Sequence, residues 1–336
     1  MTKLKVTRRR FIFISAAIAG ASLILPGFSL PKTKKLFRWR GRAMGTKIEI
    51  LLNVRNSQQY QHVISSIKNE ILRLEKIFSL YRDDSAISKL NSNGYIIDPP
   101  IELVDLVHRS INFSNFTQGA FDITVQPLWQ FHTKNTKKTD TRKLNRKVLK
   151  LVDYNSVNAN LSEIRFAKPD MAITFNGIAQ GYITDKVSSL LSSYGMKNCL
   201  LQLGETKGLG PHPSGRRWKV GIQDPFIQNK IIETVFLKNN FAIATSNGNS
   251  TFINNNPKVH HIFNPLTGLN SNYYDSVSVI SKDATTADAL STGFMNMDLL
   301  NIKKSLGKIK YLKVVLLKNK KIIKLSSKEK FQVGTT

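Results

Sequence analysis

The sequence is poor in cysteine and in long apolar segments. Cys199 is the only cysteine among 336 residues, which excludes an internal disulfide and a cysteine-ligated metal cluster. Its neighbours Leu200 and Leu201 are apolar, so we expect this thiol to be buried. The apolar run at residues 11–25 is shorter than the roughly 20 residues that a membrane-spanning helix needs.

Acidic residues are also scarce, with 22 Asp and Glu against 50 Lys and Arg and a formal net charge of +28. Such an excess can indicate binding to nucleic acid, to an anionic membrane or to acidic substrates. The lysines are scattered, however, and no zinc-finger spacing or cluster of RNA-stacking aromatics accompanies them. The basic stretch 134–150 is more typical of an exposed connection than of a nucleic-acid arm. We therefore expect a solvated basic surface and no nucleic-acid partner.

Residues 1–30 have the order of an export signal, in which basic residues precede the apolar run and Pro26 and Gly27 close it. The segment 7–12, Thr-Arg-Arg-Arg-Phe-Ile, resembles the twin-arginine export motif. This predicts a periplasmic protein exported by the twin-arginine route. Two outcomes stay open for the signal, namely cleavage, or retention as an anchor that keeps the chain at the inner membrane. Residues 31–42 are predicted to be a basic linker.

The remaining residues, 43–330, are predicted to form one domain in which helices and antiparallel strands both occur. Apolar periodicity predicts helices at 59–78, 102–113 and 284–297. Alternating or short apolar runs predict strands at 47–52, 163–167, 199–203, 218–223, 231–237, 241–245 and 277–280, and a hairpin at 311–325. Glycine and proline predict a loop at 204–215, and a turn followed by a strand is expected at 118–125.

The chain is organised around residues 173–185. The apolar run 171–175 predicts a strand, Asn176 and Gly177 predict a turn, and a helical pattern follows that stops at Gly195. Such a turn directs backbone N–H groups and the positive end of a helix dipole toward one point, which suits a phosphate. The alternative is a packing turn that binds nothing.

Four other segments carry groups that could join this turn. Asp288 and Thr292 are one helical turn apart, and their oxygens suit Mg²⁺, although such a pair is usually surface or capping chemistry. His261 could accept a proton or be structural. Tyr81 could stack on a flat ring or pack on the core. Residues 119–122 could offer backbone groups and a carboxylate to a ligand, or simply enter a hairpin.

Taken in order, these segments resemble the ApbE family of FAD:protein FMN transferases over about 250 residues. The matching pieces are Met44-Gly45-Thr46, Tyr81, Ser85, Gly119-Ala120-Phe121-Asp122, Gly177-Ile178-Ala179-Gln180-Gly181-Tyr182, Asp185, Trp218, Asp224-Pro225, Thr245-Ser246, His261-Ile262, Pro265, Thr267-Gly268, Ala287-Asp288-Ala289 and Thr292. The resemblance implies an α+β fold with two T-fold-like halves, whose antiparallel sheets are packed by helices and between which FAD binds.

The resemblance also implies a reaction. Members of the family bind FAD with a divalent metal, transfer its FMN half to a Ser or Thr of an acceptor protein and release AMP. The implied FAD contacts are Met44, Tyr81, Ala120, Phe121, Asp122, Thr174, Gln180 and Ile262. The implied Mg²⁺ ligands are Asp288, Thr292 and the backbone oxygen of Gly177. His261 is the candidate base for the acceptor hydroxyl, and Asp288 is the second candidate.

This chain departs from the common family pattern at several positions near the turn. Thr174 stands where many members have Asp, and Gln180 where they have Lys or Glu. The resulting Asn-Gly-Ile-Ala-Gln-Gly-Tyr sequence resembles a twin-arginine-exported branch linked to maturation of nitrous-oxide reductase. In that branch the acceptor is a membrane-bound flavoprotein that faces the periplasm. The alternative function is a flavin-binding maturation factor that is non-catalytic or hydrolyses FAD.

Overall fold

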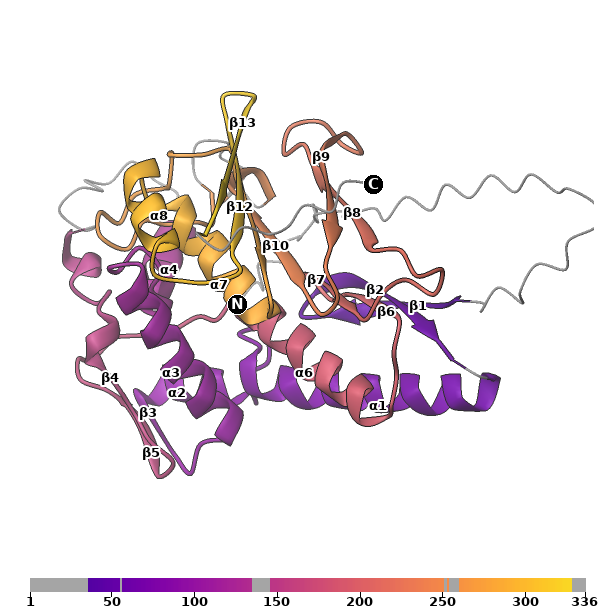
Figure 1. Ribbon diagram of the computed structural model, residues 1–336. Helices are drawn as coiled ribbons and strands as arrows, with labels where there is room; N and C mark the ends of the chain where they lie inside the picture. The colour runs from indigo at the N-terminus through magenta and orange to yellow at the C-terminus, as the bar shows by residue number, and fades with distance from the viewer. Residues whose placement is uncertain (1–35, 55, 135–145, 251–252, 254–259, 328–336) are drawn as a thin grey trace, which may run out of the picture.

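The computed structural model describes residues 36–54, 56–134, 146–250, 253 and 260–327 (Figure 1). The export segment 1–30 and the centre of the basic stretch 134–150 lie outside the described residues. The fold is α+β, as predicted, with helices packed on antiparallel sheets. The largest sheet has eight strands in the order β1-β2-β6-β7-β10-β11-β12-β13.

Two halves of the chain repeat the order of two strands, helices and two strands, as expected for T-fold-like halves. The first half contains β1 (Leu36–Ala43), β2 (Thr46–Asn53), α1 (Ser57–Phe78), α6 (Ala179–Ser193), β6 (Cys199–Gln202) and β7 (Thr206–Leu209). The second half contains β10 (Ala242–Asn247), β11 (Ser276–Ser281), α7 (Ala284–Met295), α8 (Leu299–Leu306), β12 (Lys313–Lys318) and β13 (Lys321–Ser326). Antiparallel pairing of β7 with β10 joins the halves into one sheet.

Smaller elements extend this framework. Between α1 and α6 the chain forms α2 (Ala86–Asn93), β3 (Tyr95–Ile97), α3 (Ile101–Phe116), a 3₁₀ turn η1 (Ile123–Val125), α4 (Gln126–Lys134), a second 3₁₀ turn η2 (Tyr154–Ser156), β4 (Val157–Ala159) and β5 (Glu163–Phe166). β3, β5 and β4 form a separate three-stranded sheet. β8 (Trp218–Gln223) and β9 (Ile231–Leu237) form a two-stranded sheet, and a third 3₁₀ turn, η3 (Gly248–Ser250), follows β10.

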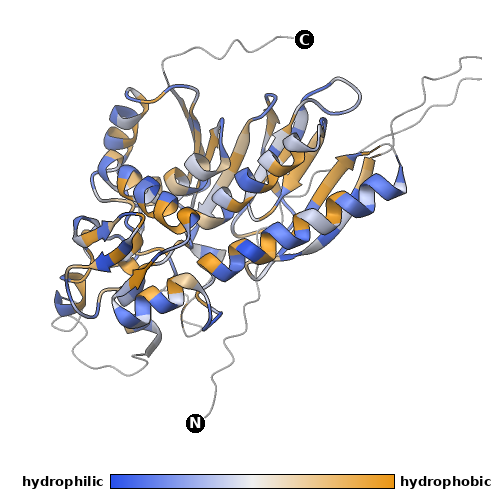
Figure 2. Cartoon of the chain, turned by 90° about the horizontal axis from the view of Figure 1, so that it is seen from below, coloured by the Kyte–Doolittle hydropathy of each residue, from blue (hydrophilic) through white to orange (hydrophobic). Residues whose placement is uncertain are grey.

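The helices and the β8–β9 sheet cover opposite faces of the large sheet. On the helix side, Ile67, Ile71 and Leu74 of α1 recur at helical spacing and are buried against the inner residues of β2. On the other side, Trp218 and Val220 pack on Leu200, Ile243 and Ile280, whose side chains point away from the helices. Figure 2 shows α1 with hydrophilic and hydrophobic faces in front of largely hydrophobic strands. Because both faces are covered, all six residues of β11 are buried.

Two predicted boundaries are wrong because local composition hid strands. From Leu36 onward, the predicted linker 31–42 is part of β1, whose full length pairs with β2. Arg38, Arg40 and Arg42 alternate with Phe37 and Trp39, which is the period of an edge strand, but the charge resembled that of a linker. Likewise, the predicted loop 204–215 contains β7, whose glycine and lysine gave no apolar signal.

Other strand predictions also need correction. Residues 123–125 form a 3₁₀ turn, and residues 171–175 are largely buried but belong to no sheet. Residues 260–263 belong to no regular strand, and Phe263 forms an isolated bridge with Asn270. β8 and β9 pair only with each other among the described strands, whereas β10, which follows them in the chain, lies in the large sheet. Among the described helices, none has the length and apolar character to cross a membrane.

Candidate active site

The candidate site is built on a close antiparallel crossing of α6 and α7. A Cβ placed on Gly177 would lie 2.9 Å from Thr292 Oγ1, and one placed on Gly181 would lie 2.8 Å from Asp288 Cβ and overlap the Ala284 carbonyl oxygen. Gly177 therefore faces Thr292, and Gly181, four residues later, faces Asp288, four residues earlier on α7. The two glycines are required because any side chain at these positions would separate the helices.

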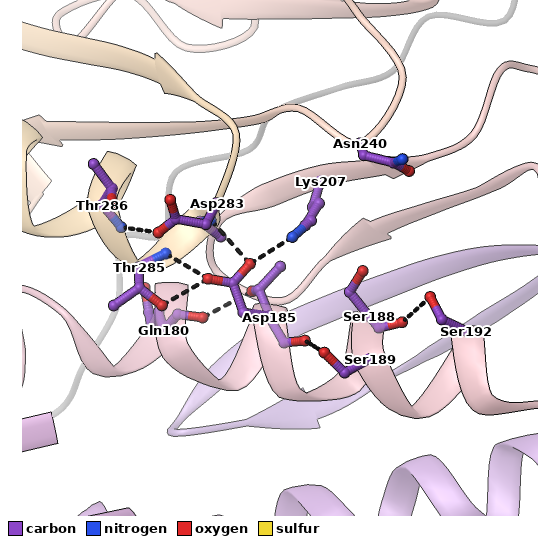
Figure 3. A network of polar contacts seen from close by, with 12 residues as sticks. Gln180, Asp185, Ser188, Ser189, Ser192, Lys207, Asn240, Asp283, Thr285 and Thr286 are labelled. Atoms are coloured by element: carbon purple, nitrogen blue, oxygen red, sulfur yellow. Dashed lines mark hydrogen bonds and ion pairs between the residues drawn. The ribbon is translucent and has the colours of Figure 1, made fainter. Parts of the chain in front are cut away.

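Asp185 closes this crossing at the start of α7 (Figure 3). Its Oδ1 accepts hydrogen bonds from the backbone N–H of Ala284 (3.0 Å) and from Lys207 Nζ (2.7 Å). Its Oδ2 accepts from the backbone N–H (2.9 Å) and the hydroxyl (2.6 Å) of Thr285. The two backbone donors are free N–H groups of a helix N-terminus, which favour a negative charge. Asp185 therefore fixes the helix that carries Asp288 and Thr292.

Asp288 is the most buried carboxylate of the site, with 4 % of its surface exposed. Its Oδ2 accepts from the backbone N–H of Gly181 at 2.9 Å, and within the described residues its Oδ1 accepts no hydrogen bond. Burial raises the pKa of Asp288, and the charge of Asp185 adds to this effect. Glu205, at the turn between β6 and β7, is also buried, and burial together with the charge of Asp288 raises its pKa.

Hydroxyl groups complete this part of the site. Ser246 Oγ lies 2.7 Å from Ser291 Oγ and 3.1 Å from Thr292 Oγ1, so β10 holds the Thr292 hydroxyl in place. The donor set that Asp288, Thr292 and Gly177 present is entirely oxygen. In the described part of the chain, no group of three His, Cys, Asp or Glu side chains could hold a metal ion by itself. One carboxylate with neutral oxygens fits Mg²⁺, which completes its coordination with waters and substrate phosphates.

The turn at residues 119–122 packs against the same helix. Gly293 faces Phe121, because a Cβ on this glycine would lie 3.1 Å from Phe121 Cβ. Asn296 Nδ2 donates to the carbonyl oxygens of Ala120 (3.0 Å) and Phe263 (3.1 Å). Asn296 therefore brings the turn and the segment after His261 together at the end of α7.

Two of the implied FAD contacts already have partners inside the chain. Asp122 Oδ1 accepts from the N–H (2.7 Å) and hydroxyl (2.6 Å) of Thr124, and its Oδ2 accepts from Tyr154 N–H at 3.2 Å. Thr174 donates its N–H to the Ile123 carbonyl at 2.8 Å, and its hydroxyl accepts from Asn176 N–H at 3.1 Å. Their side chains therefore shape the turns, and their role toward FAD stays a prediction.

The other predicted residues lie around this centre with different exposures. Tyr81 is 59 % exposed and can stack on a ligand ring, whereas the Ile262 side chain is buried. The Ile262 N–H donates to His260 Nδ1, and its carbonyl oxygen accepts from Ser271 N–H and Asn270 Nδ2, so its role toward FAD stays a prediction. Met44 has a positive φ of 47°, and its N–H donates to Glu75 Oε1 at 2.5 Å. Gln180 packs against the backbone of Gly204. His261 is partly buried, with its ring centroid 6.4 Å from that of His260.

Sequence reasoning gave no site role to several residues that build the site, although Ser246 was among the pieces that match the family. Glu205, Ser246, Asn296 and Lys207 act through contacts between segments far apart in the chain. One signal was present, since Gly177 and Gly181 have the same spacing of four as Asp288 and Thr292. That match indicates a close helix crossing only when the two segments are considered as a pair.

Comparisons with known proteins agree with the fold. The structure is similar to the flavin transferase ApbE from Vibrio cholerae, with a TM-score of 0.74 and 22% identity, covering 88% of this chain and 98% of the other. It is also similar to the ApbE protein from Thermotoga maritima, with a TM-score of 0.75 and 24% identity over 88% of this chain and 97% of the other. At these identities the likeness establishes the fold.

Sequence comparison extends the likeness to curated proteins. The FAD:protein FMN transferase of Vibrio cholerae is 27% identical over 297 residues, which cover 83% of this chain and 86% of the relative. The FAD:protein FMN transferase of Escherichia coli is 25% identical and covers 76% of each chain. Residues 44–316 match the sequence model of the ApbE family. The chain belongs to the ApbE family.

Proposed function

We propose that this protein is an FAD:protein FMN transferase that uses Mg²⁺ to transfer the FMN half of FAD to a Ser or Thr hydroxyl. The observation that carries this proposal is the crossing of α6 and α7. It packs Gly177 against Thr292 and, one helical turn further along, ties the Gly181 N–H to the Asp288 carboxylate, while Gly293 of the same helix packs on the turn at Phe121. The curated relatives with this activity cover most of the chain, which supports the same assignment.

In the reaction, the acceptor hydroxyl oxygen forms a bond to the phosphorus of the FMN half. The bond from this phosphorus to the bridging oxygen breaks, AMP leaves, and the hydroxyl proton passes to a base. Asp288, Thr292 and the Gly177 oxygen would hold the ion, and Mg²⁺ bound there neutralises the pyrophosphate charge. His261 is our candidate for the base, and Asp288 is the second candidate.

The protein itself contributes mainly position and charge. Asp185 and the Gly181 N–H fix α7, so that Asp288 and Thr292 are in place before substrate arrives. The exposed Tyr81 ring offers a stacking contact to FAD, whereas the N–H groups of Gly119, Ala120 and Phe121 already bond to Ser114 and Thr117 and thereby shape the turn. Because Thr174 and Gln180 are neutral, FAD is held here with fewer charged side chains than in relatives that have Asp and Lys at these positions.

The test is a transfer assay with co-expressed candidate acceptors. Purified protein, FAD and Mg²⁺ should add FMN to a Ser or Thr of the acceptor, detected by mass spectrometry of its peptides. Asp288→Ala should abolish the adduct. Release of free FMN and AMP with every acceptor would instead favour an FAD hydrolase. Tight FAD binding that neither turns over nor changes in Asp288→Ala would favour the non-catalytic maturation factor.

We also propose that the protein works in the periplasm on a membrane-bound flavoprotein. The motif at residues 7–12 supports export by the twin-arginine route. Replacing Arg8 and Arg9 by lysine should keep the protein in the cytoplasm, as cell fractionation would reveal. Periplasmic location of that variant would contradict the proposed route. The length of the exported protein, measured by mass spectrometry, would distinguish a cleaved signal from a retained anchor.

A further inference from the structure

Glu205 lies beside the proposed metal site although the resemblance gives it no role. It follows Gly204 in the turn between β6 and β7, where φ of Gly204 is +101° and Leu203 N–H donates to the Glu205 carbonyl at 2.9 Å. The backbone N–H of Thr245 donates a hydrogen bond to the Glu205 carboxylate. Glu205 is buried, with 6 % of its surface exposed. Thr245 directly precedes Ser246, whose hydroxyl contacts Thr292. Glu205 is thus fixed at the inner edge of the site.

Glu205 and Asp288 form a buried pair of like charges. Glu205 follows Gly204, which packs against Gln180, and Gln180 directly precedes Gly181, whose N–H donates to Asp288 Oδ2. Among the described residues neither carboxylate has a basic partner within salt-bridge distance, and the nearby Lys207 is bound to Asp185. Buried carboxylates are costly unless a cation or several donors compensate them. Here Asp288 accepts a hydrogen bond from the backbone N–H of Gly181, and Glu205 accepts one from the backbone N–H of Thr245.

Gln180 occupies the position from which a basic side chain could place a positive charge beside the two carboxylates. A Cβ placed on Gly204 would lie 2.5 Å from both Cδ and Oε1 of Gln180, so the amide rests on the turn that carries Glu205. A lysine at this place would put an ammonium group next to the carboxylate pair. Since Gln180 is neutral, the negative charge at the site remains available to a bound ion.

We propose that Glu205 supplies the second negative charge of the divalent-cation site and acts as a positioning residue that strengthens ion binding through Asp288. The proposal rests on the proposed function, because that function supplies the reason for an ion at Asp288. Glu205 itself neither contacts the substrate nor transfers a proton. The affinity of the site for a divalent ion should therefore depend on both carboxylates, even when FAD and acceptor are absent.

The test measures binding of Mn²⁺ alone to the purified full-length chain, followed by the electron paramagnetic resonance signal of free Mn²⁺. Glu205→Gln should weaken Mn²⁺ binding about 10- to 100-fold, the usual effect of losing a residue that supports a metal ligand. The thermal midpoint of the metal-free variant should be equal to or above that of the parent chain, because a buried repulsion is removed. A merely structural glutamate would instead lower the midpoint and leave Mn²⁺ binding unchanged.

Glu102→Gln is the matched control. Glu102 is a mostly buried carboxylate that pairs with Arg73 at 2.7 Å, far from α7 in sequence and in none of the site contacts. This variant should lower stability and leave Mn²⁺ affinity unchanged. Equal Mn²⁺ affinity in Glu205→Gln and the parent chain would overturn the proposal.

A second variant keeps the proposal testable if Glu205→Gln does not fold. Gln180→Lys places an ammonium group beside the pair and should also weaken Mn²⁺ binding, whereas the neutral Gln180→Met should not. Equal affinities in these two variants would overturn the proposal. Because no FAD is present, these results are separate from the transfer assay. Loss of Mn²⁺ binding in Asp288→Ala but not in Glu205→Gln would refute the role of Glu205 and leave the proposed function intact.

Discussion

The backbone N–H of Gly181 donates to Asp288 Oδ2 at 2.9 Å, which ties the start of α6 to the middle of α7. One turn earlier Gly177 meets Thr292, and one turn later Asp185 meets the first residues of α7. The carboxylate proposed to bind the ion is therefore held by a backbone N–H, which every substitution of Gly181 other than proline keeps. What mutation can change is the distance between the helices.

Gly181→Ala should widen this crossing. The added methyl group would overlap the Ala284 carbonyl oxygen, and overpacking of this kind costs about 1–3 kcal/mol. We expect a lower free energy of unfolding in urea and weaker Mn²⁺ binding, because the N–H moves away from Asp288. Ser189→Ala on the exposed side of α6 is the control and should change stability by less than about 0.5 kcal/mol. A normal midpoint and normal Mn²⁺ affinity in Gly181→Ala would contradict the close crossing.

Asp185→Asn should destabilise the protein more than Asp283→Asn does, although both aspartates serve the N-terminus of α7. Asp283 is the N-cap and accepts from Thr286 N–H at 2.7 Å, a role that Asn fills as well as Asp. Asp185 instead pairs with Lys207 and accepts four hydrogen bonds, so an amide NH₂ would face donors. We expect a loss of about 1–3 kcal/mol for Asp185→Asn and near-neutral stability for Asp283→Asn, measured by urea unfolding. Equal losses of stability would show that the hydrogen bonds of Asp185 contribute no more than the N-cap bond of Asp283.

The helices and most strands could be predicted from the sequence because their signals are local. In α1 the buried residues recur every three or four positions, so the pattern alone indicates the helix. β1 could not be found in this way, because its exposed arginines obscure the alternation and only pairing with β2 stabilises it. The segment 171–175 is apolar like a strand but is buried by tertiary contacts without pairing.

The site was partly predictable for the same reason. Asp288 and Thr292 share one helix, so their common face follows from spacing, and the family resemblance added Gly177. No site role was predicted for Glu205 or Ser246, because a glutamate at a glycine turn and a serine on a strand are usually exposed or structural. Their roles depend on contacts across the junction of β7 and β10, which no local pattern describes.

The stability contribution of Asp122 should depend on pH. Burial raises its pKa from 3.8 to about 6 in the folded chain. Between about pH 4 and 6 the folded state therefore binds more protons than the unfolded state, so the free energy of unfolding falls as the pH rises. Asn cannot titrate. Relative to Asp122→Asn, the parent chain should therefore lose up to about 3 kcal/mol of unfolding free energy between pH 4 and pH 7. Urea unfolding at each pH measures it, and a constant difference would contradict the shift.

Ser246→Ala should weaken ion binding without a large loss of stability. The Ser246 hydroxyl is held by Ser291 at 2.7 Å and reaches Thr292 Oγ1 at 3.1 Å, so its removal frees the Thr292 hydroxyl to rotate. We expect Mn²⁺ affinity to fall about 10-fold and the free energy of unfolding to fall by about 1 kcal/mol.

The matched control for Ser246→Ala is Ser278→Ala on the neighbouring strand. The Ser278 hydroxyl lies 2.8 Å from Thr245 Oγ1, so this variant breaks a similar pair of hydroxyls one residue away but does not touch Thr292. Its loss of stability should match that of Ser246→Ala, while its Mn²⁺ affinity stays that of the parent chain. Mn²⁺ titrations of the two variants thus separate the orientation of a ligand from the general packing of β10 and β11. Equal weakening in both would mean that the sheet, and not the hydroxyl of Ser246, sets the position of Thr292.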